Sequence, residues 1–204
     1  MTTSEKATYH HGDLKKALTE AGLQVLQQEG LNALSLRRVA REASVSPAAP
    51  YRHFTDKHAL LIAISEHGFT ELESRLRDSK ENRPGDIDAS GAAYLSFAIE
   101  NPELYRLMFT QNIMRETEAD HDAKERSREA FLRLVETIEN GIQNNHIEDT
   151  QCHMLALSAW SLVHGVSMLA IDGVLAGSPF EELSHSQIFK TAQSYFKNGW
   201  RSKK

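Results

Sequence analysis

The sequence has 204 residues, 40% of them hydrophobic, and a formal net charge of −5. This length is ample for a buried core in one or two domains, and the negative charge excludes a generally basic nucleic-acid binder. With only 11 Gly and 5 Pro, and no alternating runs of Val, Ile and Thr, a sheet-based fold is also excluded, and we expect an all-α protein.

The charge is unevenly distributed along the chain. Residues 1–58 contain 8 Lys and Arg against 6 Asp and Glu, whereas residues 59–204 contain 15 against 22. A basic head on an acidic body is typical of a protein whose head contacts DNA. We therefore expect two domains, residues 1–58 and residues 59–204. Because the head is only mildly basic, its affinity for DNA should depend on placement and dimerisation more than on bulk charge.

The first predicted element is a polar arm, residues 1–9, followed by a helix from Asp13 to Gly30. The apolar side chains of this helix recur at helical spacing and give it one buried face. They are Leu14, Leu18, Ala21 and Val25.

A helix-turn-helix pattern follows in residues 35–57, SLRRVAREASVSPAAPYRHFTDK. Ser35 is a suitable N-cap for a helix of about two turns. After a turn at residues 44–46, Ser46 is a second N-cap, with Pro47 at the first position of a short helix that ends near His53.

A long helix is predicted to begin at Lys57, with Asp56 as its N-cap. A lysine in the first turn opposes the helix dipole, which indicates a nearby anion such as a DNA phosphate. On the preceding short helix, small side chains allow the backbone to approach base edges, and longer ones reach phosphates. The predicted DNA contacts are Ser35, Arg37, Ser46, Ala48, Ala49, Tyr51, Arg52, His53 and Lys57.

This ordered set of features resembles the TetR family of bacterial transcriptional regulators. The resemblance covers about the first 60 residues: a first helix ended by Gly30, then LRRVAREASVS, YRHF and DK. It implies a homodimer that binds a double-stranded operator through a three-helix N-terminal head. Many members have glycine in place of Ser44 and an aliphatic residue in place of Pro50, which lacks a backbone N–H. We therefore expect a recognition helix that is short or distorted in its first turn.

Six further helices are expected in the body, which makes about nine in all. They span residues 57–77, 89–100, a short segment from Pro102, and then residues 122–145, 150–177 and 186–200. Residues 80–88 are expected to form a loop around Pro84-Gly85, and residues 110–119 to be irregular. The family resemblance implies that the last two helices form the dimer interface, with Phe196 among its apolar residues.

Residues 160–165, WSLVHG, resemble a Trp-x-x-x-His-Gly signature in the C-terminal domain of one branch of the family. Nearby aromatic residues are candidates to line a cavity for a small apolar or amphipathic ligand. The alternative is that the aromatics fill the core and that His164 is a hydrogen-bonded core histidine. The candidate lining residues are Phe69, Tyr94, Phe97, Tyr105, Met108, Phe109, Phe131, Trp160 and His164.

The remaining patterns argue against metal, cofactor and membrane binding. The pair His10-His11 lacks a third ligand at a suitable spacing, and His146 with Cys152-His153 matches no closed zinc pattern. Residues 154–177 are long enough to cross a bilayer, but His164, Asp172 and several serines interrupt them, so we expect a buried helix. One cysteine and no signal-peptide pattern predict a cytoplasmic protein.

No catalytic motif of the GxSxG, P-loop or HExxH type is present, so an enzyme is not expected. The sequence predicts a homodimeric transcriptional regulator, a repressor that a ligand releases from a palindromic operator. The alternative that stays open is a DNA-binding regulator that recruits a protein partner without a small-molecule effector.

Overall fold

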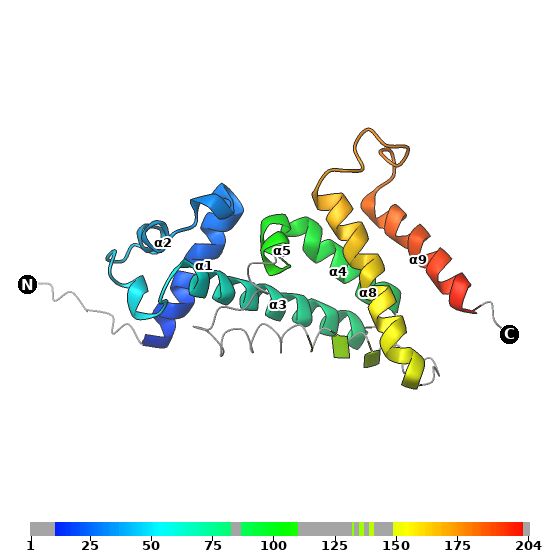
Figure 1. Ribbon diagram of the computed structural model, residues 1–204, viewed down its shortest axis with the longest axis horizontal. Helices are drawn as coiled ribbons and strands as arrows, with labels where there is room; N and C mark the ends of the chain where they lie inside the picture. Colours follow the sequence, from blue (N-terminus) through cyan, green and yellow to red (C-terminus); the bar gives the residue numbers. More distant parts are fainter. Residues whose placement is uncertain are drawn as a thin grey trace, which may run out of the picture.

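The computed structural model describes residues 11–82, 87–109, 132, 135–136, 139–140 and 149–201. Over these residues the chain is all-α, as predicted, with seven α-helices and two short 3-10 helices. In chain order they are α1 (His11–Glu29), η1 (Leu31–Ala33), α2 (Leu36–Glu42), η2 (Pro50–Arg52), α3 (Lys57–Asn82), α4 (Ile87–Glu100), α5 (Pro102–Met108), α8 (Asp149–Ile171) and α9 (His185–Arg201). Figure 1 shows α1 and α2 at one end of the molecule, α8 and α9 at the other, and α3 running between them.

The predicted starts of α2, α3 and α5 are confirmed. The backbone N–H of Arg38 donates to Ser35 Oγ over 3.1 Å, and that of Ala59 donates to Asp56 Oδ1 over 2.9 Å. Each bond satisfies a donor that the first turn of a helix leaves unpaired. Pro102 occupies the first turn of α5, where its missing N–H costs nothing.

Three predicted boundaries in the body are wrong. The helix from Lys57 continues to Asn82, and α4 already begins at Ile87, so the predicted loop at residues 80–88 is too long at both ends. Lys, Glu and Asn continue a helix readily, whereas the break in the sequence comes only at Pro84-Gly85. The last boundary is that of α8, which ends at Ile171 and not near residue 177. Gly173 follows with a φ of 68°, a left-handed conformation that terminates helices.

The predicted helix at residues 122–145, including Phe131, lies outside the described residues except for residues 132, 135–136 and 139–140. Residues 1–10 and residues 110–119 also lie outside the described part. The side chains of residues 149–153, which include Cys152 and His153, also lie outside the described part.

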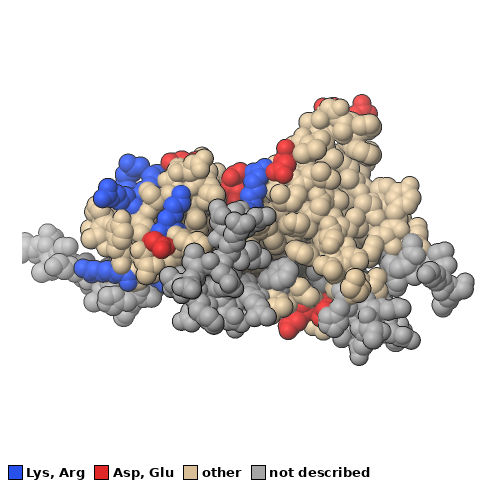
Figure 2. Space-filling view, viewed as in Figure 1, with Lys and Arg blue, Asp and Glu red and all other residues tan. Residues whose placement is uncertain are grey.

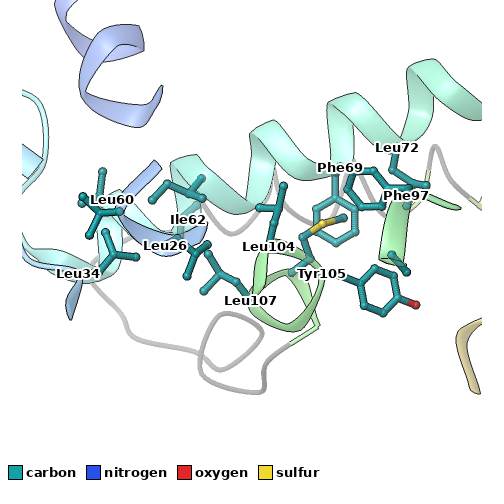
Figure 3. Packing of buried hydrophobic residues seen from close by; sticks show 14 of the residues in the cluster. Leu26, Leu34, Leu60, Ile62, Phe69, Leu72, Phe97, Leu104, Tyr105 and Leu107 are labelled. Atoms are coloured by element: carbon teal, nitrogen blue, oxygen red, sulfur yellow. The ribbon is translucent and has the colours of Figure 1, made fainter. Parts of the chain in front are cut away.

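One hydrophobic core extends from the head into the body along α3. Figure 3 shows its side chains in a row, from Leu34 and Leu60 near the head to Phe69, Leu72 and Phe97 in the body. The α5 side chains Leu104, Tyr105 and Leu107 pack into the same cluster. Closely packed cores transmit displacement, so a shift of α3 in the body also moves the side chains that pack on it in the head.

Helix α5 lies against α3 and is tied to its other neighbours by polar contacts. A Cβ added to Gly68 on α3 would lie 2.6 Å from Met108 Sδ, so a larger residue there would force the Met108 side chain to shift. Arg106 donates to the Ile171 carbonyl over 2.5 Å and to Asp172 Oδ1 over 3.1 Å, at the end of α8. The α5 helix therefore connects the end of α8 to the helix that leads to the head.

Helix α8 is the one described helix that is long and apolar enough to span a membrane. Residues 154–171 have a mean hydropathy of 1.7, and 28% of this segment is buried. Its inner face packs against α4 and its outer face is exposed.

Candidate functional site

The turn after α2 depends on a left-handed residue. Ser44 has a φ of 54°, the one positive φ at a non-glycine position among the described residues. The Ser44 N–H bonds the Arg41 carbonyl over 3.1 Å, and the Val45 N–H bonds the Ala40 carbonyl over 2.9 Å. This pair of bonds is the Schellman ending of a helix, in which the left-handed position is normally glycine.

Replacing Ser44 by glycine should therefore stabilise the protein. Glycine reaches this backbone conformation without the Cβ clash that serine has, and Ser44 is exposed, so no packing is lost. We expect Ser44→Gly to raise the free energy of unfolding by about 0.5–1 kcal/mol. Chemical denaturation measures this change. A destabilised variant would mean that the serine side chain supports the turn.

The segment after the turn is not the α-helix that the sequence pattern predicted. Residues 47–49 form a turn in which the Ala49 N–H donates to the Ser46 carbonyl, and only Pro50–Arg52 are helical, as a 3-10 turn. Pro47 and Pro50 both lack the N–H that an α-helical bond needs. The prediction of a Ser46 side-chain cap is also wrong, whereas the expected shortening at Pro50 is confirmed.

Most of the predicted DNA-contacting side chains lie on the surface of the head. Tyr51 is 54% exposed, and Ala49 and His53 are half-buried. The others are exposed: Ser35, Arg37, Ser46, Ala48, Arg52 and Lys57. Figure 2 shows Lys and Arg side chains gathered at the end of the molecule that holds α1 and α2, whereas the surface over α8 and α9 is mostly uncharged. On this surface, cations surround the Tyr51 ring and several small side chains. Such an arrangement is suited to contact the phosphates of a DNA backbone.

Two cations of the head, Lys57 and Arg38, bond other groups of the protein. Lys57 Nζ donates to the Leu31 carbonyl over 3.1 Å, which explains a lysine at this unfavourable end of a helix. Arg38 bonds Glu29 over 2.5 Å and Glu42 over 2.7 Å, and these bonds raise the pKa of Arg38. Only the Arg38–Glu42 pair, four residues apart, has a signal in the sequence. Arg38 holds α2 on α1 and so positions the turn.

In the body, four polar groups of the predicted ligand cluster bond one another. Trp160 Nε1 donates to Tyr94 Oη over 3.1 Å, and Tyr105 Oη donates to Tyr94 Oη over 2.9 Å. His164 Nδ1 shares a hydrogen bond with Tyr105 Oη at 2.6 Å. The WSLVHG residues of α8 are thereby joined to α4 and α5. Burial raises the pKa values of both tyrosines, so both stay protonated.

Aromatic rings surround this polar network. The ring centroids of Phe109 and His164 lie 4.6 Å apart, and those of Phe109 and Tyr105 lie 4.9 Å apart. Phe69 on α3 meets Phe109 edge to face at 5.6 Å. Phe97 and Met108 are fully buried at the base of the cluster. The structure thus brings together eight of the nine predicted residues, and the ninth, Phe131, is not described.

His164 should make the protein sensitive to acid. Burial lowers the pKa of His164 below its usual value of about 6.5. Between the two pKa values the unfolded chain binds a proton that the folded chain does not, so stability falls as the pH falls below about 6.5. We expect His164→Leu to lose about 1–3 kcal/mol at pH 7.5 and less at pH 5. Denaturant titrations at one protein concentration measure this, and an equal loss at both pH values would contradict it.

Comparisons with known proteins agree with this geometry. A model described as bacterial regulatory proteins, tetR family, matches residues 18–64, and one described as tetracyclin repressor-like, C-terminal domain, matches residues 87–190. The chain belongs to the TetR family. It is thus a DNA-binding transcriptional regulator, as predicted, and the family is non-enzymatic.

Relatives of known sequence or structure cover between 78% and 95% of this TetR-family chain. The uncharacterised HTH-type transcriptional regulator YobS of Bacillus subtilis is 30% identical over 78% of this chain and 79% of its own. A protein of unknown function from Rhodococcus sp. RHA1 is 31% identical, with a TM-score of 0.74 over 95% of this chain and 98% of its own. The fatty acid degradation regulator FadR of Bacillus halodurans shares the fold at 13% identity, with a TM-score of 0.66 over 95% and 99% of the two chains.

Proposed function

We propose that this TetR-family protein is a cytoplasmic homodimeric repressor that a small apolar or amphipathic ligand releases from a palindromic operator. The observation that carries the proposal is the position of the aromatic cluster. It lies on α3, the helix that begins in the head at Lys57, and includes Phe69 from that helix. A molecule that enters the cluster must displace side chains that pack on α3.

A dimer is supported by the outer face of α8. Met154, Leu157 and Leu169 are 62%, 49% and 44% exposed, and lie on one face because their spacing follows the helical repeat. Ser161 and Gly165 lie between them, and a Cβ on Gly165 would meet no atom within 4 Å. An exposed apolar face with small residues at its centre suits close packing against a second helix.

In the proposed mechanism the dimer has two states, which differ in the distance between its two DNA-binding heads. Two-fold related heads contact successive major grooves when their recognition elements lie about 34–36 Å apart. A ligand that binds the other spacing more tightly lowers DNA affinity by the ratio of its affinities for the two states. The α5 contacts of Arg106 with the end of α8 provide a second connection between the dimer face and α3.

Ligand binding and DNA release should occur together. In a Trp200→Phe variant, Trp160 is the single tryptophan and reports on the cluster. We expect an apolar compound that changes Trp160 fluorescence to release labelled operator DNA over the same concentration range, because the two equilibria are linked. A library of apolar compounds, screened first by fluorescence and then by anisotropy of the DNA, measures both.

The polar bonds within the cluster favour the other candidate function. Tyr94, Tyr105, Trp160 and His164 bond one another and so need no ligand to satisfy them. A compound that Trp160 detects but that never affects DNA would contradict ligand release. A DNA-binding regulator that recruits a protein partner would then be the better description.

A further inference from the structure

A second concave surface lies on the side of α4 that faces away from the aromatic cluster. It is a groove of about 600 Å³ between α4 and α9. Tyr94 on α4 joins the cluster, whereas Leu95 and Ile99 line the groove. The two helices lie close together at Gly91, where an added Cβ would lie 2.5 Å from the Phe189 ring. The volume lies in the range of small-molecule sites.

The groove is lined by a largely buried glutamine whose amide has no hydrogen-bond partner among the described residues. Gln193 on α9 is only 7% exposed and lines the groove. Within the described residues, its amide neither donates nor accepts a hydrogen bond, and its Nε2 lies 3.4 Å from where a Cβ of Gly91 would stand. The amide atoms are not among the fully buried unpaired atoms of the described residues, so they open onto the groove. There the amide offers a ligand two donors and an acceptor from a side chain that packing holds in place.

The charge and polarity of the lining indicate the class of ligand. Lys190 precedes Gln193 by three residues, so both lie on the same face of α9, and Lys190 is exposed and forms no ion pair with any described residue. Beside them, Leu95, Ile99 and Phe189 form an apolar floor. The Asp88 carboxylate also lines the groove at the start of α4, which favours the Lys190 end for an anionic group.

We propose that the groove between α4 and α9 binds small carboxylic acids with an apolar chain. The carboxylate accepts hydrogen bonds from the Gln193 amide and the Lys190 ammonium, and the chain lies over Leu95 and Ile99. This site is separate from the aromatic cluster, and its occupation does not depend on ligand release from DNA.

Calorimetric titration of the full-length protein with octanoate, below its micelle concentration, tests the site. We expect octanoate to bind, and octan-1-ol to bind more weakly because it lacks the charge. Lys190→Met should weaken octanoate binding by about three- to fivefold, the range of an exposed ion pair, and leave octan-1-ol binding unchanged. Lys16→Met, which removes an exposed lysine from α1, is the matched control and should change neither.

Gln193→Leu gives a second readout that a merely structural glutamine would not give. An apolar side chain of similar size removes the amide and keeps the packing, so we expect the melting temperature without octanoate to stay within about 2 °C of that of the unaltered protein. The same variant should bind octanoate at least threefold more weakly. Weaker binding at unchanged stability separates a ligand contact from a structural role.

Three results would overturn the site. One is an absence of octanoate binding at millimolar concentration. Another is a Lys190→Met variant that binds octanoate as tightly as Lys16→Met does. The third is octanoate binding that Trp160→Phe abolishes and Lys190→Met leaves intact, which would place the ligand in the aromatic cluster and support the effector proposal instead.

Discussion

A Leu157→Asp chain should be monomeric, with unchanged helix content. Leu157 is 49% exposed on the outer face of α8, so an aspartate there costs little in the single chain. In the proposed dimer the same carboxylate would be buried without a partner, which is strongly unfavourable. Operator affinity should fall by roughly 10²–10⁴-fold, because each head then binds its half-site alone. Light scattering, circular dichroism and DNA titration measure the three effects.

Ile99→Asp is the matched control for this change. Ile99 is also an exposed apolar residue, at 39%, but it lies on α4, away from the outer face of α8. This variant should remain dimeric. The family resemblance also implied Phe196 as an interface residue, but Phe196 is half-buried within its own chain, so Phe196→Asp would disturb that chain as well. A Leu157→Asp chain that still scatters as a dimer would place the interface elsewhere.

Arg52→Ala should weaken DNA binding by a similar factor on every sequence. Arg52 is exposed beside Tyr51 and forms no ion pair within the described residues, so its guanidinium is available to a phosphate. A homodimer loses two such contacts. The slope of log affinity against log salt should therefore become shallower by about 1.8, or about 0.9 for each lost contact. Anisotropy titrations at several salt concentrations measure the slope.

Two further variants are compared with Arg52→Ala. Arg77→Ala removes an exposed arginine from the body half of α3 and should leave the slope unchanged. Lys57→Ala should also flatten the slope if Lys57 reaches a phosphate while it bonds the Leu31 carbonyl. An unchanged slope for Lys57→Ala would mean that this lysine bonds the Leu31 carbonyl and does not contact a phosphate. An unchanged slope for Arg52→Ala would contradict the placement of the DNA-binding surface.

Local signals in the sequence were sufficient for the starts of α2, α3 and α5. Ser35, Asp56 and Pro102 each begin a helix where capping rules place them, since a cap depends on residues only a few positions apart. The same local rules also explain the main error in the head. Pro47 is favourable in the first turn of a helix, but a second proline at position 50 removes a further N–H, and only a 3-10 turn remains.

Contacts between distant parts of the chain could not be predicted in this way. Nothing in the helical periodicity indicates that Lys57 meets the Leu31 carbonyl, or that Arg38 meets Glu29. The aromatic residues were predicted as a group from their composition, but their polar bonds depend on how α4, α5 and α8 pack. Gln193 was missed for the same reason, because its burial arises only where α9 meets Gly91.

The most direct test of a dimeric, sequence-specific regulator is to sequence the DNA that the purified protein retains from random genomic fragments. We expect the retained fragments to share an inverted repeat, with half-sites whose centres lie about one helical turn apart or a whole number of turns apart. Leu157→Asp should retain no such repeat. Fragments without a common inverted repeat, or equal retention of all DNA by the unaltered protein, would contradict a two-fold symmetric dimer that binds a palindromic operator.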